Sequence, residues 1–149
     1  EKNNPNTPVD VEAKFRIEIN DATISGMIDR VEQTPEGEYE VVDFKTGYAY
    51  KNKNTIKEDV QMNIYALGTE KLYGKLPKKT SLFYIKDNKF VPHFIEKETL
   101  DEFTKSLGEK VDNIFDEKFD AAPEFRKCSR CDYASICDAK EEVSWMWWN

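Results

Sequence analysis

Two aspartates and one lysine in the first third of the chain have types and a spacing that suit metal-assisted phosphodiester chemistry. Asp29 follows Gly26 by three residues, and Asp43 precedes Lys45 by two. Carboxylate oxygens bind hard divalent cations such as Mg²⁺ and Mn²⁺. A bound cation lowers the pKa of a water molecule and neutralises phosphate charge. A lysine can position that water, help to deprotonate it, or stabilise developing negative charge.

Side-chain alternation decides whether these three groups can meet. Residues two apart on a strand point to the same side, so Asp43 and Lys45 would face one site together. Asp29 joins them if its strand pairs with theirs. An isolated Asp-x-Lys tripeptide arises often by chance, and an ordinary ion pair on a strand edge is the alternative. The Gly-x-x-Asp at this spacing favours the site.

Three predicted strands position the two acids. Alternating apolar and charged residues predict a strand over 9–19, and β-branched residues predict a second over 23–33. A third strand follows over 38–45. Short turns between them predict an antiparallel meander that places the two acids on neighbouring strands. The residues predicted to share the buried face of the first strand are Val9, Val11, Ala13, Phe15, Ile17 and Ile19.

A helix predicted over 56–73 carries two more polar side chains that could contribute to the site. Gln61 and Tyr65 stand four apart and therefore share a face of that helix. They would lie beside an apolar stripe that includes Ile64 and Leu67. Lysines 51, 53 and 57 occupy the polar loop before the helix, where they either solubilise the loop or contact phosphate locally.

The rest of the chain predicts a hairpin, a second long helix and a cysteine segment. Strands are predicted over 80–86 and 89–95, and Pro92 makes the latter an edge strand. His93 is expected at the surface there. The predicted second helix covers 99–119. Its predicted core residues are Leu100, Phe103, Leu107, Val111, Ile114 and Phe115.

Composition limits the class of protein. The chain has 149 residues, 39% of them hydrophobic, which predicts a single domain over 1–149. A net charge of −7 argues against a protein that coats DNA generally, but less against a nuclease that needs carboxylates. No membrane segment or signal peptide is evident, so we expect a cytoplasmic protein. Residues 1–8 are expected to be a flexible start, and the beginning at Glu1 suggests a piece of a longer chain.

Three cysteines lie within residues 121–140, namely Cys128, Cys131 and Cys137. An odd, clustered set does not suit a disulfide framework, so a metal in a reducing cytosol is the preferred interpretation. Buried or free thiols are the alternative. The chain ends with Trp145, Trp147 and Trp148, which would pack back on the domain, meet the rest of a longer polypeptide, or stack on bases.

The order of four motifs carries a family resemblance. Gly-Met-Ile-Asp-Arg, Val-Val-Asp-Phe-Lys-Thr-Gly, Gln-Met-Asn-Ile-Tyr and Cys-Ser-Arg-Cys-Asp-Tyr-Ala-Ser-Ile-Cys follow one another over residues 9–140. Together they resemble the RecB-like branch of the PD-(D/E)xK nuclease superfamily, including AddAB-type and CRISPR-adaptation exonucleases. The resemblance implies an α/β (α+β) fold with a restriction-endonuclease-like core, in which helices flank a central mixed sheet.

The resemblance also implies roles for individual residues. Asp29 and Asp43 would hold Mg²⁺ or Mn²⁺ together with the main-chain carbonyl of Phe44, and Lys45 would be the catalytic lysine. The helix pair, Gln61 and Tyr65, would orient the lysine or contact DNA. The cysteines at 128, 131 and 137 would be three ligands of a 4Fe-4S cluster.

Two departures from the family pattern matter. The family usually has an upstream helix with a His or Glu for the metal, whereas few residues precede the first strand here. Glu12 or Glu18 are possible substitutes. A fourth cysteine also usually lies upstream, and a cubane cluster normally takes four thiolates. Both departures are explained if this chain is the C-terminal part of a longer protein that supplies the fourth ligand. Otherwise the cluster would be three-ligated, recruit a non-cysteine ligand, or be replaced by zinc or nothing.

Three functions follow in order of preference. The first is a metal-dependent DNA nuclease, expected to be an exonuclease, in DNA repair, recombination or CRISPR adaptation. The second is an inactive nuclease-like module that binds DNA ends or acts as a scaffold beside helicase or other domains of a longer protein. The third is a zinc-ribbon-like interaction domain, which three cysteines without a nearby fourth ligand disfavour.

Overall fold

The computed structural model describes residues 6–140, so most of the predicted flexible start and all of the tryptophan tail lie outside the described residues. The chain divides into two compact units, Glu1–Asp112 and Asn113–Asn149. The predicted elements that carry the site all fall in the first of these units.

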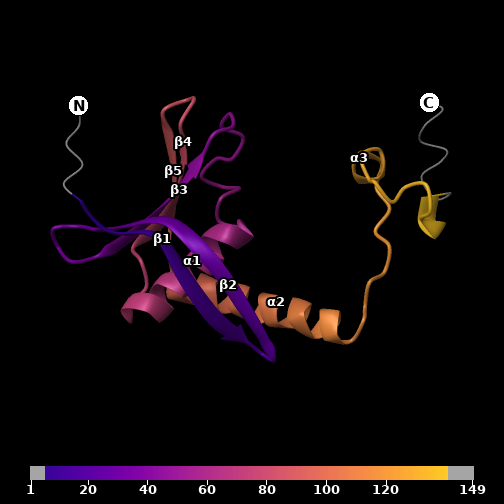
Figure 1. The fold of residues 1–149 in the computed structure, drawn as a ribbon, viewed down its shortest axis with the longest axis horizontal. Helices are drawn as coiled ribbons and strands as arrows, with labels where there is room; N and C mark the ends of the chain where they lie inside the picture. The colour runs from indigo at the N-terminus through magenta and orange to yellow at the C-terminus, as the bar shows by residue number, and fades with distance from the viewer. Residues whose placement is uncertain (1–5, 141–149) are drawn as a thin grey trace. The chain divides into compact units, whose positions relative to one another are not determined.

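A mixed five-stranded sheet forms the centre of the first unit, in the order β1-β2-β3-β4-β5 (Figure 1). The first three strands pair as the predicted antiparallel meander, β4 runs parallel to β3, and β5 returns antiparallel to β4. Flanking helices complete the predicted α+β class. The strands are β1 (Thr7–Ile19), β2 (Ala22–Gln33), β3 (Tyr39–Lys45), β4 (Lys79–Tyr84) and β5 (Lys89–Phe94).

Two of the six residues predicted to form the buried face of β1 are exposed. Ala13, Phe15, Ile17 and Ile19 are buried as predicted, but Val9 and Val11 are 44% and 64% exposed. Glu12 has a positive φ of 52°, and the pairing of β1 with β2 shifts register between Pro8 and Asp10. Helix α1 packs against the second half of β1, where the Phe15 ring contacts it. Alternation in the sequence does not reveal how far a covering helix extends.

Helix α1 (Val60–Tyr73) connects the parallel strands β3 and β4 and begins four residues later than predicted. Asp59 is its N-cap, with a side-chain oxygen accepting a hydrogen bond from the Met62 N–H at 3.2 Å. Such a cap fixes where the helical hydrogen bonds start. Gly74 ends the helix in the left-handed region, with φ of 72°, as its predicted stop requires.

The buried face of α1 also differs from the prediction. The predicted stripe residues Ile64 and Leu67 are only half-buried, and Val60 is 45% exposed. Apolar and small residues occur on nearly every side of this helix, so periodicity alone cannot select the core face. The residues that the sheet buries are Met62, Asn63, Tyr65, Ala66, Gly68 and Thr69.

The edge strand β5 carries Pro92 as predicted, but the surface location predicted for His93 is wrong. His93 is only 5% exposed, and its Nε2 lies 3.3 Å from the Asn63 Oδ1 of α1. Burial and the nearby charge of Lys57 lower the pKa of His93. An edge strand leaves one row of backbone groups open, but an adjacent helix can still cover its face.

Helix α2 (Lys97–Phe115) is close to its predicted span. Leu100 and Val111 are buried as predicted, whereas Ile114 and Phe115 are each 60% exposed, so their assignment to the core was wrong. These two residues lie past Asp112, where the first compact unit ends. The second unit contains the short helices α3 (Phe125–Cys128) and η1 (Asp138–Lys140).

Candidate metal and phosphodiester site

Strand β3 presents Asp43 and Lys45 on one side, as strand alternation predicts. The Lys45 Nζ lies 2.7 Å from the Asp43 Oδ2 in an ion pair. Asp43 is almost completely buried at 2% exposure, while the lysine side chain keeps about a third of its surface. The pair therefore lies at the margin of the core, with the acid inside and the ammonium group toward solvent.

Asp29 reaches the same place from the neighbouring strand. The β2–β3 pairing has its last matched residues at Arg30 and Val42, so Asp29 and Asp43 come next on the two strands. The Asp29 Oδ2 accepts a hydrogen bond from the Phe44 N–H at 2.9 Å, which anchors this carboxylate on β3. The structure thus brings together the two acids and the residue whose carbonyl was predicted as a third ligand.

Burial and charge set the protonation of the pair. Desolvation raises the pKa of Asp43, and the nearby charges of Asp29 and Asp59 add to this effect, while Lys45 opposes it. Partial burial by itself would lower the pKa of Lys45. The hydrogen bond and charge of Asp43 outweigh that effect and leave the lysine pKa above its usual value. Lys45 is therefore a cation at neutral pH.

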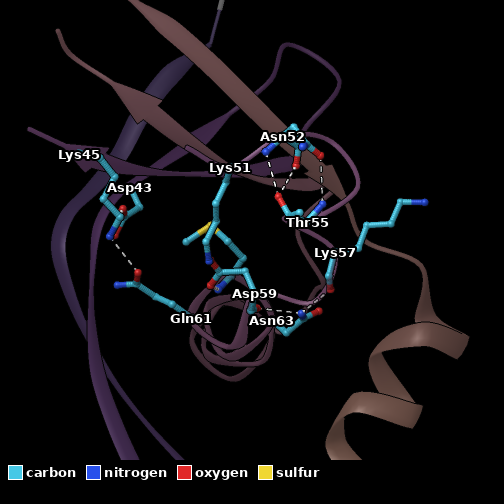
Figure 2. Close-up of polar contacts among 10 residues, drawn as sticks. Asp43, Lys45, Lys51, Asn52, Thr55, Lys57, Asp59, Gln61 and Asn63 are labelled. Carbon is cyan, nitrogen blue, oxygen red and sulfur yellow. Dashed lines mark hydrogen bonds and ion pairs between the residues drawn. The ribbon is translucent and has the colours of Figure 1, made fainter. Parts of the chain in front are cut away.

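The two predicted helix residues complete a hydrogen-bonded chain, of which Figure 2 shows the bond between Lys45 and Gln61. Lys45 Nζ donates to the Gln61 Oε1 at 2.9 Å, and the Gln61 Nε2 donates to the Tyr65 hydroxyl at 2.8 Å. Tyr65 is buried, and desolvation raises the pKa of its hydroxyl group. Gln61 and Tyr65 thus hold the lysine from the α1 side while Asp43 holds it from the sheet.

The sequence did not single out Asp59, and it assigned Lys51 only to a polar loop, but the two residues fix the start of α1 beside the site. Asp59 is buried, and its carboxylate forms an ion pair with Lys51 as well as capping the helix (Figure 2). Asn63 adds hydrogen bonds to the carbonyls of Asp59 and Lys57 at 2.9 and 3.0 Å. The available signal was an acid one residue before an apolar helical run, which is the expected position of a cap.

The structure gives a physical reason for the glycine three residues before Asp29. The Phe15 ring lies over Gly26, so that a Cβ added there would come within 2.6 Å of a ring atom. On the other side, a Cβ at Gly68 of α1 would come within 2.7 Å of the same ring. One buried phenylalanine is therefore sandwiched between two glycines, which lets α1 approach the sheet closely enough for Gln61 to reach Lys45.

Asp29 and Asp43 suit a hard divalent cation. Both offer carboxylate oxygens, and the Asp43 Oδ2 is buried without a properly oriented hydrogen-bond partner despite its ion pair with Lys45. Among residues 6–140, no three or more His, Cys, Asp or Glu side chains gather as a metal site. Glu12 and Glu18 therefore do not complete this one, and Glu18 accepts a hydrogen bond from Thr23 instead.

The three cysteines of the second unit are not assembled around a common centre. Cys128, Cys131 and Cys137 are free thiols, and they do not form a metal-binding group within the described residues. Cys131 is exposed and the other two are half-buried. The chain supplies one thiolate fewer than a cubane cluster takes, so these residues by themselves do not fit the predicted 4Fe-4S cluster.

Comparisons with known proteins identify the family of the chain. A model of the PD-(D/E)XK nuclease superfamily matches residues 1–138. The Gene 69 proteins of Mycobacterium phages D29 and L5 are 30% and 29% identical over 133 residues, or 85% of this chain. The chain spans 47% and 43% of their lengths, less than half of each.

A solved structure supports the fold. The crystal structure of SSO0001 matches with a TM-score of 0.53 at 19% identity, covering 88% of this chain and 61% of that one. This likeness, with the mixed sheet, confirms the predicted restriction-endonuclease-like class. Within residues 6–140, none of the helices has the length and apolar character needed to cross a bilayer.

Proposed function

The chain belongs to the PD-(D/E)XK nuclease superfamily, and we propose that it is a metal-dependent deoxyribonuclease domain. The observation that carries the proposal is the convergence of Asp29, Asp43 and Lys45 at the end of two paired strands. Nucleases of this superfamily generally use divalent cations such as Mg²⁺. Within the proposal, Asp29, Asp43 and the Phe44 carbonyl would hold the cation, and a bound cation would lower the pKa of the attacking water.

The proposal gives Lys45 a direct role at the phosphate and gives Gln61 and Tyr65 a supporting role. Asp43 and Gln61 hold the Lys45 ammonium group in place, and its positive charge stabilises the negative charge that develops on the phosphate. Gln61 and Tyr65 are positioning residues, since they hold the ammonium group in place through hydrogen bonds. We propose removal of nucleotides from DNA ends, in repair, recombination or CRISPR adaptation, as part of a longer cytoplasmic protein with helicase or other domains.

A substitution at Asp43 tests the proposal. Asp43→Asn preserves the buried volume but removes the charge, and we expect a loss of at least about 100-fold in Mg²⁺- or Mn²⁺-dependent cleavage of linear DNA. The control is Asp101→Asn, which changes an exposed acid on α2 that forms an ion pair with Lys97. Cleavage of a linear but not a circular duplex would identify the exonuclease activity. Equal cleavage by Asp43→Asn and the unchanged protein would refute the assignment.

One observation favours a second function. Only two acids meet at the site within the described residues, whereas a third is a common metal ligand in the family. A module that binds DNA ends without cutting them would have this arrangement. Titration calorimetry with Mn²⁺ separates the two: heat that disappears in Asp43→Asn supports the nuclease. DNA binding without any Mn²⁺ binding supports the scaffold. In either case, an iron–sulfur cluster requires a fourth ligand from outside this chain.

A further inference from the structure

Two large aromatic side chains that follow Lys45 in the sequence are largely exposed to solvent. Tyr48 is 72% exposed and Tyr50 is 75% exposed, although tyrosine rings usually have much of their surface covered. Ala49, between them, packs against the core, and its N–H donates to the Asp87 carboxylate in the β4–β5 turn. The segment is therefore fixed at its middle residue, and the rings on either side face outward.

Neighbouring side chains hold both rings. The Tyr50 ring packs edge-on against the buried ring of Tyr84, with centroids 6.1 Å apart. Lys86 Nζ lies 4.9 Å from the centroid of the Tyr48 ring, and Lys51 Nζ lies 5.8 Å from that of Tyr50. Each exposed aromatic ring thus has an ammonium group beside it, which is attracted to the electron-rich ring face.

The surroundings of the two rings are basic in an acidic protein. Residues 46–59 and the turn at 86–89 together carry five lysines and three acids, while the chain as a whole has a net charge of −7. Lys53 and Lys57 are exposed in this loop. A polyanion would therefore be attracted to this part of the surface more than to the rest of the protein.

These features match the chemistry of an unpaired nucleic-acid strand. Stacking on aromatic rings and contacts from lysines to phosphates are the two means by which proteins hold single strands without reading sequence. In a duplex the base faces are already stacked on one another. Tyr48 is three residues from Lys45, so the chain between them spans at most about 11 Å. The rings therefore lie within a short reach of the phosphodiester site.

We propose that Tyr48 and Tyr50 form a stacking platform that binds unpaired bases of a DNA strand and delivers its backbone to the site. The proposal rests on the proposed nuclease function, and it assigns a single-stranded substrate, or a frayed or resected end, to that function. Lys86 and the lysines of the loop contact the phosphates.

Binding measured without cleavage tests the platform. Fluorescence anisotropy in EDTA at a fixed salt concentration gives the Kd of the full chain for a labelled 20-nucleotide oligothymidylate and for a blunt duplex of equal length. One stacked base contributes on the order of a 5- to 150-fold change in affinity. We expect Tyr48→Ala/Tyr50→Ala to weaken single-strand binding by at least about 30-fold and duplex binding by less than about twofold.

Two control variants make the result specific to ring stacking. Tyr48→Phe/Tyr50→Phe keeps both rings and should retain single-strand affinity within about threefold. Tyr133→Ala removes a tyrosine of equal exposure, 72%, from the second unit, and should leave binding unchanged. Circular dichroism checks that each variant is folded. Single-strand affinity equal to that of the unchanged protein in the double alanine variant, or an equal loss for single strand and duplex, overturns the platform.

The platform and the nuclease can fail separately. If the unchanged protein binds oligothymidylate through the two tyrosines but leaves both the oligonucleotide and a linear duplex intact with Mn²⁺, the platform is supported and the nuclease function is refuted. If it degrades the oligonucleotide while the double alanine variant binds it normally in EDTA, the nuclease is supported and the platform is refuted.

Discussion

Replacing Asp59 by alanine should destabilise the protein by about 2 kcal/mol, because this buried residue has two partners. Loss of an N-cap hydrogen bond costs about 0.5–2 kcal/mol, here the bond from the Met62 N–H to the Asp59 carboxylate. The Lys51 ion pair adds only about 0.2–1 kcal/mol, since the lysine side chain is 24% exposed and its charge is partly screened by solvent. For a chain of this size, 2 kcal/mol corresponds to a decrease in Tm of about 4–8 °C.

Urea unfolding followed by circular dichroism measures this loss and separates its two parts. Asp59→Asn keeps an acceptor for the Met62 N–H and removes only the charge, so it should lose at most about 1 kcal/mol. Lys51→Met removes the ion pair and leaves the cap, with a loss between those of the other two variants. A free energy of unfolding for Asp59→Ala within about 0.5 kcal/mol of the unchanged protein would refute the reasoning. So would equal losses for the alanine and asparagine variants.

Two further predictions concern the packing around the site. His93 is the single histidine, and its burial, with a smaller effect from the charge of Lys57, lowers its pKa below the ordinary 6.5. As the pH drops below 6.5, the unfolded chain therefore binds a proton before the folded protein does. The free energy of unfolding should fall in this pH range. The imidazole NMR signal should titrate below pH 6.5, and titration at 6.5 would contradict this prediction. In urea unfolding, His93→Gln should reduce the pH dependence of the unfolding free energy between pH 5 and 6.5. Gly26→Ala should cost about 1–3 kcal/mol, because its Cβ would overlap the buried Phe15 ring, whereas Gly47→Ala, with open space around it, should change stability by less than about 0.5 kcal/mol. Equal effects of the two substitutions would argue against the packing of Phe15 as the cause.

The strands could be predicted from the sequence because their signal is local. Period-two alternation and short turns predict the meander, and the meander in turn places Asp29 beside Asp43. Asp43 and Lys45 share a side for the same reason. The pairing of β2 with β3 and the alternation along β3 determine these positions without any information on packing. The relative placement of Asp29, Asp43 and Lys45 therefore follows almost directly from the sequence.

The positions set by contacts between distant elements could not be predicted. The core face of α1 depends on which of its many apolar sides meets Phe15, and the start of the helix depends on Asp59 and on Lys51, eight residues earlier. His93 lies on an edge strand, yet Asn63 of α1 gives it a buried partner. In each case a residue from another element decides the outcome, and a periodic pattern within one element contains no information about that residue.

The contacts that position Lys45 also limit its chemical role. A lysine ammonium group has three N–H donors; Gln61 accepts one of them and Asp43 forms an ion pair with the group, which leaves donor capacity to reach a phosphate. A general base would have to lose its proton, and in the protein without a bound cation the negative charge of Asp43 raises the pKa of Lys45. Charge stabilisation needs the proton and the position together, so it is the role that these contacts favour.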